Sequence, residues 1–173
     1  MNYYLLDGEE TERLLFRTIQ ISDYNEWLEF FENNETSKYW IANYEKPEIE
    51  CRKWYEKQFM RYETGMGGMN ALVEKETKRL IGHCGLLIQT VDNIMEVEIG
   101  YSLLPSFWNR GFATEAAAKC KAFAFQRKLS PSLISIISLT NIPSTIVAKK
   151  IGMTLDKSTW YGLNAVNIFR VYL

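Results

Sequence analysis

Apolar and polar positions alternate along the chain in blocks that predict alternating strands and helices. The apolar run at 13–19 predicts a first strand. A helix is predicted to follow from Asp23, because Asp23 and Glu26 have the spacing of a capping box. Four apolar residues then recur at helical spacing: Tyr24, Trp27, Leu28 and Phe31. The polar run at 32–38 is expected to end this helix.

The middle of the chain predicts one long helix and three strands. Pro47 suits the first turn of a helix, and an apolar stripe extends that helix to about Tyr62. The glycine-rich segment 64–68 predicts a flexible turn. Three strand-like runs follow, at 70–74, 79–89 and 94–104. Short polar turns separate these runs, so we expect an antiparallel meander.

The last third of the chain predicts a helix, a buried strand, a second helix and two closing strands, at 112–127, 133–139, 142–151, 154–160 and 165–172. The strand, helix and strand within 94–139 imply one parallel crossover. The expected fold is therefore α/β (α+β), with a single mixed sheet of six to seven strands flanked by helices. No linker or repeat divides the chain, which predicts one domain over 1–173.

Composition and charge narrow the class of protein. The 173 residues are 47% hydrophobic, which suits one globular domain and excludes a disordered chain. The net charge of −1 argues against nucleic acid and membrane surfaces as partners. Three cysteines without metal-ligand spacing predict reduced thiols, no metal site and a cytoplasmic location. We see neither a signal peptide nor a membrane-spanning run.

The segment 108–116 joins a predicted strand to a predicted helix and has the residues of an anion site. Gly111 lets the backbone approach a ligand closely, and the amides of 110–114 would form the unsatisfied first turn of the helix. Arg110 would add a cation. Glu115 would repel a phosphate if it pointed inward, so we expect it to point outward. An ordinary helix cap is the alternative interpretation.

A second segment, 141–153, follows the buried strand. Asn141 can cap the helix that begins there. Ser144, Ala148 and Ile151 share one helical face. A stripe of such small residues indicates either close helix packing or room for a slender ligand.

Together the two segments resemble the GNAT superfamily of acyl-CoA-dependent N-acetyltransferases, and within it the RimJ/RimL branch of ribosomal-protein N-terminal acetyltransferases. The first segment reads Trp-Asn-Arg-Gly-Phe-Ala-Thr-Glu-Ala over 108–116, where that branch often has Trp-Gly-x-Gly-aromatic-Ala-Thr-Glu-Ala. The second matches at Asn141, Ser144, Lys150, Gly152 and Met153. One departure is Asn109 in place of the usual glycine. Asn tolerates left-handed backbone angles, so the loop is expected to keep its shape.

The resemblance implies a GNAT-like fold whose sheet splays between the strands at 94–104 and 133–139, and acetyl-CoA as the cofactor bound in that cleft. The pyrophosphate would rest on the amides of 110–114, and the pantetheine arm would pair with the backbone of 102–104. The residues implied for cofactor binding are Ser102, Leu103, Leu104, Asn109, Arg110, Gly111, Phe112, Ala113, Thr114, Asn141, Ser144, Ala148 and Lys150.

The resemblance also implies direct attack by a free amine, with Glu98 as base, Ser144 as acid and Asn141 as a positioning group. Glu96, on the same strand face, and water are alternatives to Glu98 as base. His83 and Cys84 are adjacent on a strand and face opposite sides, which excludes a nucleophile–base pair.

The acceptor stays open among a protein N-terminus, a polyamine, an amino acid and an aminoglycoside, in a groove expected from 27–45 and 158–168. Two other functions stay open as well: a non-catalytic acyl-CoA-binding module and an interaction domain without cofactor. The protein is expected to be a monomer or a homodimer.

Overall fold

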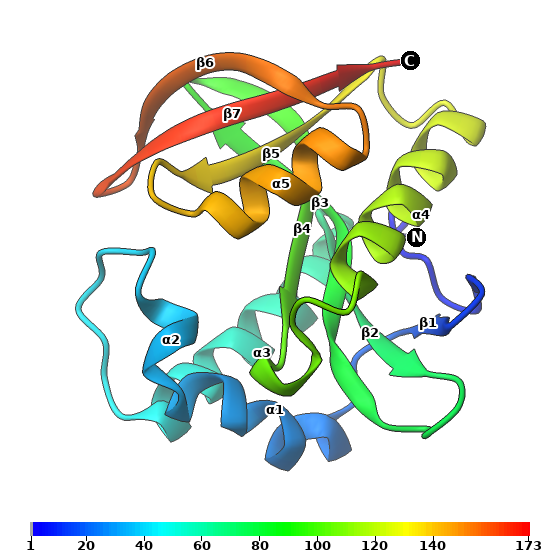
Figure 1. The fold of residues 1–173 in the computed structure, drawn as a ribbon, viewed down its shortest axis with the longest axis vertical. Helices are drawn as coiled ribbons and strands as arrows, with labels where there is room; N and C mark the ends of the chain where they lie inside the picture. The colour runs from blue at the N-terminus through cyan, green and yellow to red at the C-terminus, as the bar shows by residue number, and fades with distance from the viewer. Residues whose placement is uncertain (1) are drawn as a thin grey trace.

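The computed structural model describes residues 2–173, and one seven-stranded mixed sheet runs through them (Figure 1). Its strands are β1 (Leu14–Arg17), β2 (Gly67–Glu74), β3 (Leu80–Val91), β4 (Ile94–Leu103), β5 (Ser132–Ser138), β6 (Thr154–Tyr161) and β7 (Asn164–Tyr172). The strand order is β1-β2-β3-β4-β5-β7-β6. Every neighbouring pair is antiparallel except β4 and β5, which are parallel. The predicted mixed sheet with one parallel crossover is confirmed.

Helices cover both faces of the sheet. They are α1 (Tyr24–Glu32), α2 (Asn34–Ser37), α3 (Pro47–Thr64), α4 (Phe112–Gln126) and α5 (Ile142–Lys150), with 3₁₀ turns η1 (Ile21–Asp23) and η2 (Pro105–Phe107). His83 contacts Trp27 of α1 and Trp54 of α3, whereas its neighbour Cys84 contacts Cys120 of α4. Adjacent strand residues point to opposite faces. Helices α1 and α3 therefore cover one face of β3, and α4 covers the other.

Two local predictions were wrong. Asp23 does not form a capping box with Glu26; its carboxylate accepts the Gln20 N–H and pairs with Arg17 at 2.7 Å, which starts a 3₁₀ turn before α1. The polar run 32–38 ends α1 at Glu32, as predicted, and it also contains the short helix α2, because the Asn33 side chain accepts the Glu35 N–H and caps it.

The second error concerns the glycine-rich segment. Gly67 and Gly68 are the first residues of β2 and not part of a flexible turn. A Cβ on Gly68 would lie 2.7 Å from the Tyr62 ring, so only glycine lets α3 lie this close to the strand.

Helix α4 lies close to the sheet because small side chains face it. Ala116, Ala117 and Ala124 are fully buried against β3 and β4. The small alanine side chains, which also favour the helical conformation, permit this close approach. This packing also fixes the start of α4 beside the end of β4.

Strands β4 and β5 pair at one position and then diverge. The only Cα pair between these two strands joins Glu98 to Ile134, and the Ser135 hydroxyl donates to the Ile99 carbonyl at 2.9 Å. Beyond Ile99, β4 has no partner on this side within the described chain, while β5 pairs along its whole length with β7. The expected splay is confirmed, and it leaves one edge of β4 open near the start of α4.

Candidate active site

The loop before α4 presents a run of backbone amides. Asn109 has φ +58° and Gly111 has φ +82°, so both adopt the left-handed conformation. Within residues 2–173, none of the amides from Asn109 to Thr114 donates a hydrogen bond to the protein. These free N–H groups and the positive end of the helix dipole form a cradle for an anion. Asn109 preserves the turn where the resemblance leads us to expect glycine.

The Arg110 side chain does not point its charge into this cradle. Its guanidinium lies 3.2 Å from the Glu74 carboxylate and 4.9 Å from the centre of the Phe112 ring. We expected Arg110 to add a fixed cation to the anion site. Glu74 instead takes up that charge, so the cradle consists of backbone amides.

Glu115 turns to the N-terminal segment of the chain. Its carboxylate accepts hydrogen bonds from the Thr11 hydroxyl at 2.5 Å and from Arg13 Nε at 2.7 Å. Burial alone would raise the pKa of Glu115, but these bonds lower it. Arg13 also donates to the Arg110 carbonyl at 3.0 Å. Glu115 therefore points away from the cradle, as expected. Its bonds to Thr11 and Arg13 anchor the loop to the segment that leads into β1.

The open edge of β4 carries the backbone groups of alternate residues. The Leu104 N–H donates to Ile81 on the β3 side, whereas the Leu103 carbonyl accepts the Trp108 indole N–H at 2.8 Å on the opposite side. Alternate residues present their backbone groups to opposite edges, so the backbone groups of Tyr101 and Leu103 face the splay. Those of Ser102 and Leu104 face β3, which corrects the expectation that all of 102–104 pair with the pantetheine arm.

Helix α5 borders the splay on its other side. The Asn141 side chain accepts the Ser144 N–H at 3.1 Å, as a helix cap does. The Tyr101 hydroxyl donates to the Ser144 carbonyl at 2.8 Å, which links β4 to the first turn of α5. The Ala148 side chain is fully buried in the core, so it was wrong to expect Ala148 in a ligand site. Lys150 is exposed at the end of α5.

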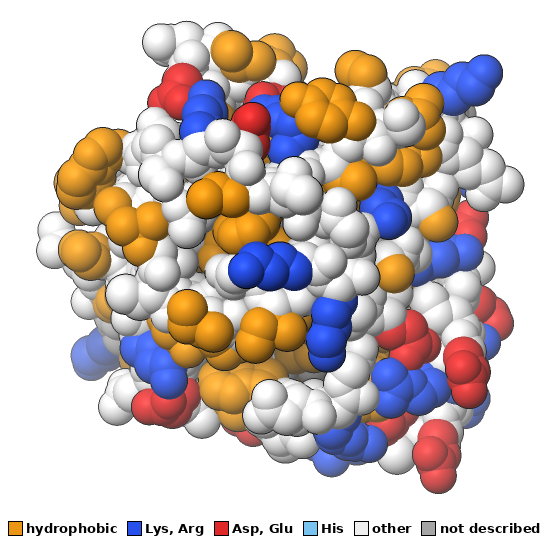
Figure 2. All heavy atoms as spheres, turned by 45° about the horizontal axis from the view of Figure 1, so that its top comes forward, with side chains coloured by type: hydrophobic (Ala, Val, Ile, Leu, Met, Phe, Trp, Pro, Cys, Tyr) orange, Lys and Arg blue, Asp and Glu red, His pale blue; other side chains and the backbone are white. Residues whose placement is uncertain are grey.

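Side chains of mainly basic and apolar type surround this region. In the space-filling view of the side that carries α5, acidic side chains lie toward the edges, while basic and apolar ones occupy the middle (Figure 2). That distribution suits an anionic ligand.

Glu98 lies at the point where β4 and β5 diverge. Its carboxylate accepts the Gln89 side-chain N–H at 2.7 Å. Burial raises the pKa of Glu98, and the hydrogen bond from Gln89 and the charges of Arg61 and Lys57 only partly oppose that rise. A carboxylate with a raised pKa can accept a proton near neutral pH.

Glu96 has a different environment. Arg170 holds its carboxylate through two hydrogen bonds, at 2.7 and 3.0 Å, and also pairs with Asp156. The pair stabilises the packing of β7 near β4, and both side chains are mostly buried. Of the two carboxylates on this strand face, Glu98 alone is free of an ion pair within residues 2–173.

The loop between α2 and α3 reaches the β6–β7 hairpin (Figure 1). The Asn164 amide accepts the Ile41 N–H at 2.6 Å and donates to the Ile41 carbonyl at 3.2 Å. Trp40 and Tyr161 pack against the same small apolar cluster of the C-terminal strands. The two segments expected to line an acceptor groove are therefore in contact.

Sequence reasoning missed four residues near Glu98: Lys57, Arg61, Gln89 and Tyr161. Gln89 follows a run of nine buried positions in β3, and a polar residue at the end of such a run could have marked it. Arg61 and Lys57 lie on a helix whose polar positions look like an ordinary solvated face. No spacing rule distinguishes them.

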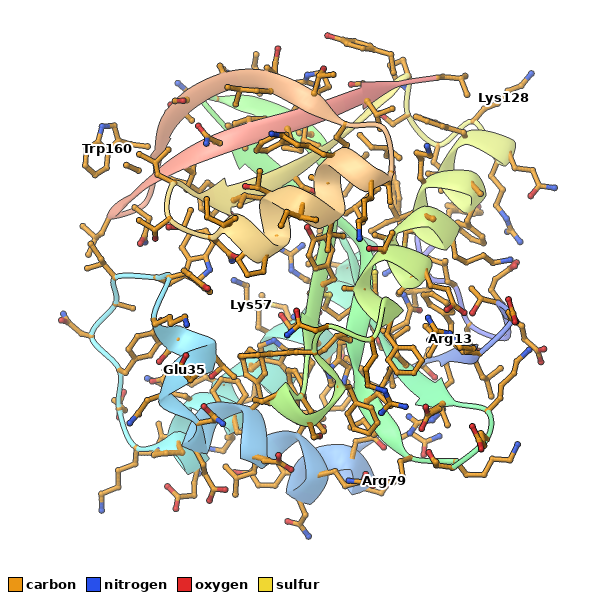
Figure 3. The ribbon with its side chains drawn as sticks, in the orientation of Figure 1. Arg13, Glu35, Lys57, Arg79, Lys128 and Trp160 are labelled. Atoms are coloured by element: carbon orange, nitrogen blue, oxygen red, sulfur yellow. The ribbon has the colours of Figure 1, made fainter. Side chains whose placement is uncertain are left out.

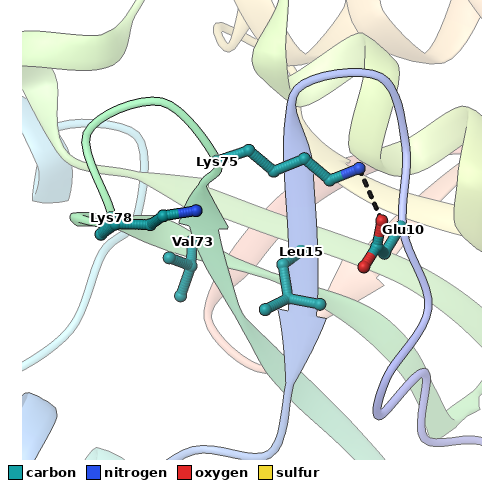
Figure 4. Close-up of a pocket in the computed structure, with 5 residues that line it drawn as sticks. All are labelled: Glu10, Leu15, Val73, Lys75 and Lys78. Carbon is teal, nitrogen blue, oxygen red and sulfur yellow. Dashed lines mark ion pairs between the residues drawn. The ribbon is translucent and has the colours of Figure 1, made fainter.

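Other features carry no chemistry for this site. His83 and Cys84 face opposite sides, as predicted, and Cys84 Sγ lies 3.5 Å from Cys120 Sγ. A surface pocket beside the Glu10–Lys75 ion pair lies at the β1–β2 edge of the sheet, away from the splay (Figure 4). No helix among residues 2–173 is long and apolar enough to span a membrane.

A splayed mixed sheet with an amide cradle beside its open strand defines the class to which the chain belongs. The family model for the acetyltransferase (GNAT) domain matches residues 13–154, and the chain is a member of that family. It is an N-acetyltransferase, and the acetyl donor that this family uses is acetyl-CoA.

The relatives support this assignment. YkkB of Bacillus subtilis, an uncharacterised protein, is 32% identical over 114 residues, which span 65% of this chain and 66% of YkkB. YoaA of the same species, an uncharacterised N-acetyltransferase, is 26% identical over 144 residues, or 83% and 80% of the two chains. An acetyltransferase from Agrobacterium tumefaciens has a TM-score of 0.81 at 25% identity, covering 95% and 94%. RimL, a ribosomal L7/L12 α-N-protein acetyltransferase solved with coenzyme A, shares the fold, with a TM-score of 0.75 at 16% identity over 96% and 97%.

Proposed function

We propose that this acetyltransferase moves an acetyl group to a primary amine by direct attack, with Glu98 as the general base. The observation that carries the proposal is the position of Glu98, held by Gln89 where β4 and β5 diverge. Acetyl-CoA, when bound, supplies an acetyl thioester. The remaining work of binding, orientation and proton transfer falls to residues of this chain.

The residues present fit coenzyme A. The free amides from Asn109 to Thr114 would hold the pyrophosphate. Tyr101 and Leu103 would pair with the pantetheine arm along the open edge of β4, and a backbone N–H there would hold the thioester carbonyl. Asn141 uses its oxygen as a helix cap, so its amide N–H₂ is the part that can reach a ligand.

Glu98 would take a proton from the ammonium group of the acceptor. Only the unprotonated amine is a nucleophile, so removal of this proton precedes attack. The raised pKa of Glu98 brings its basicity closer to what this transfer needs. Gln89 keeps the carboxylate oriented while the proton moves.

Ser144 is the proposed acid. Its carbonyl accepts the Tyr101 hydroxyl, and this contact holds the first turn of α5 against β4. The Ser144 hydroxyl lies beside the Tyr101 hydroxyl, and in this proposal it donates to the departing thiolate. We propose that the acceptor is a small molecule or a protein N-terminus and that the enzyme is cytoplasmic.

The test is a panel of amines assayed with acetyl-CoA and free-thiol detection, using wild type and Glu98→Gln. Loss of a general base is expected to lower kcat by roughly 10²–10⁴-fold. The thermal shift produced by coenzyme A should persist in the variant by linkage. Glu63→Gln, an exposed change on α3, is the matched control.

The other outcomes identify the alternatives. Full turnover by Glu98→Gln removes Glu98 as the base and leaves water in that role. Coenzyme A binding without turnover of any amine indicates a non-catalytic acyl-CoA-binding module.

A further inference from the structure

Lys57 is a cation beside the proposed base that the mechanism above does not use. It lies on α3 one helical turn before Arg61, and Figure 3 shows its side chain pointing from α3 toward the C-terminal half of the sheet. Within residues 2–173 its ammonium group forms no ion pair or hydrogen bond. Partial burial and the charge of Arg61 lower the pKa of Lys57, while Glu98 opposes this shift. Lys57 is therefore a solvent-accessible cation whose surroundings already remove part of its hydration.

Two other lysines near the acceptor side are paired. Lys38 pairs with Glu35 at 2.6 Å, and Lys53 pairs with Glu45 and Glu50. Lys46 has no ion pair within residues 2–173, but it precedes the first turn of α3. Lys57 instead lies one helical turn before Arg61, which donates to the Gln89 side chain that holds Glu98.

Arg61 adds to the positive charge around Glu98. Its guanidinium donates to the Met66 and Ile88 carbonyls and to the Gln89 side chain, at 2.9–3.1 Å. No carboxylate pairs with Arg61 in the described part of the chain. Arg170 on this side of the sheet is paired with Glu96 and Asp156, so Lys57 and Arg61 are the two cations near Glu98 that have no carboxylate partner within residues 2–173.

We propose that Lys57 binds a carboxylate of the acceptor, so that the substrate is a small amine bearing a carboxylate near the amino group, as a free amino acid does. The proposal rests on the proposed acetyl transfer with Glu98 as base. In this arrangement the amino group meets Glu98 and the carboxylate meets Lys57. A polyamine would instead bring a second cation toward Lys57 and Arg61, which repels it.

The contact is expected to act on binding more than on chemistry. The carboxylate of an amino acid does not change its charge as the amine attacks, so Lys57 stabilises ground state and transition state alike. An interaction of this uniform kind lowers KM and leaves kcat nearly unchanged.

The experiment compares each of four amino acids with its own α-carboxamide as acceptor: L-phenylalanine, L-leucine, L-methionine and L-glutamate. The carboxamide keeps the side chain and the amine and loses only the negative charge. Its amine is also less basic, which by itself favours its reaction, so preference for the amino acid has to come from recognition. We expect wild type to prefer the carboxylate of at least one pair about tenfold or more in kcat/KM, as one charged hydrogen bond provides.

Two variants of Lys57 and one control complete the design. Lys57→Met should abolish the preference through KM, with kcat within about threefold of wild type at a pH above the acidic limb, where Glu98 is deprotonated in both proteins. Lys57→Arg should keep most of it, because the charge remains. Lys128→Met removes the same charge at the distant end of α4 and should behave as wild type (Figure 3).

Each result has a defined meaning. Equal turnover of amino acids and carboxamides by wild type overturns the proposal, as does preference for spermidine or for a peptide N-terminus. Retention of the preference by Lys57→Met overturns it as well. Coenzyme A binding without turnover of any amine is distinct from these results, because it overturns the proposed acetyl transfer and this inference with it.

Discussion

The side-chain amide of Gln89 is fixed in one orientation relative to Glu98. Its nitrogen donates to the Glu98 carboxylate at 2.7 Å, while its oxygen accepts from Arg61 at 2.9 Å and from the Tyr161 hydroxyl at 3.2 Å. Arginine has no acceptor atom, so the amide oxygen has to face Arg61. The amide nitrogen is thereby directed to Glu98, which makes Gln89 a positioning residue for the proposed base.

Gln89→Met is expected to weaken acetyl transfer by raising the pKa of Glu98 further. The hydrogen bond from Gln89 lowers this pKa, and its loss leaves the effect of burial less opposed. Glu98 has to be deprotonated to act, so activity increases as the pH rises through its pKa. The acidic limb of the pH–kcat/KM profile should move to higher pH, and a shift of one unit lowers kcat/KM on that limb about tenfold.

Tyr161→Phe provides the graded comparison for this variant. It removes one of the two donors to the Gln89 oxygen and keeps the ring, so the acidic limb should move less than in Gln89→Met. An unchanged acidic limb in Gln89→Met, in a folded variant that binds coenzyme A, would show that Gln89 does not set the ionisation of the base.

In the loop before α4, a change to the backbone should weaken coenzyme A binding more than removal of the Arg110 side-chain charge. Arg110→Met should change the dissociation constant of coenzyme A by less than about threefold, because Glu74 already takes up the Arg110 charge. Gly111→Ala should weaken binding more, since alanine at φ +82° costs roughly 1–2 kcal/mol and shifts the amides. Calorimetric titration with coenzyme A measures both.

Asn109→Gly is the control for this loop. Both residues accept φ +58°, so binding should equal that of wild type or become tighter. If Arg110→Met loses more affinity than Gly111→Ala, the guanidinium and not the amide cradle holds the phosphates.

The sequence predicted the features that depend on local pattern. Strand and helix order, the left-handed turn at Asn109 and the alanine face of α4 all follow from residue types at short spacing. The partners of charged side chains could not be predicted in the same way. Arg110 pairs with Glu74, 36 positions away, and Glu96 pairs with Arg170, 74 positions away. Such contacts depend on where β2 and β7 lie in the sheet, and short-range sequence periodicity does not predict that placement.

The same distinction applies within the site. Alternation along β4 placed Glu96 and Glu98 on one face, and the two were equivalent by that rule. Only the tertiary contacts separate them, because Arg170 engages Glu96 and Gln89 engages Glu98. The preference for Glu98 as base came from the family resemblance, and the tertiary contacts supply a physical reason for it that alternation along the strand does not.

His83 predicts how stability depends on pH. It is the single histidine of the chain and is fully buried, and neither ring nitrogen has a hydrogen-bond partner within residues 2–173. Burial lowers the pKa of His83 well below 6.5. Below pH 6.5 the unfolded chain therefore binds a proton that the folded chain does not. The free energy of unfolding should fall by up to about 1.4 kcal/mol per pH unit as the pH decreases below that value.

His83→Leu should flatten this dependence, because an apolar side chain replaces a ring that makes no hydrogen bond. Glu98 contributes the opposite sign, since a raised carboxyl pKa lets the folded chain bind a proton first on acidification. That contribution is present in both proteins, so the difference between them reports His83 alone. Urea unfolding at half-unit steps between pH 5 and 7.5 measures the two slopes. Parallel slopes would mean that His83 gains a partner and titrates normally in the folded protein, and the packing of Trp27 and Trp54 against its ring would then need a different physical explanation.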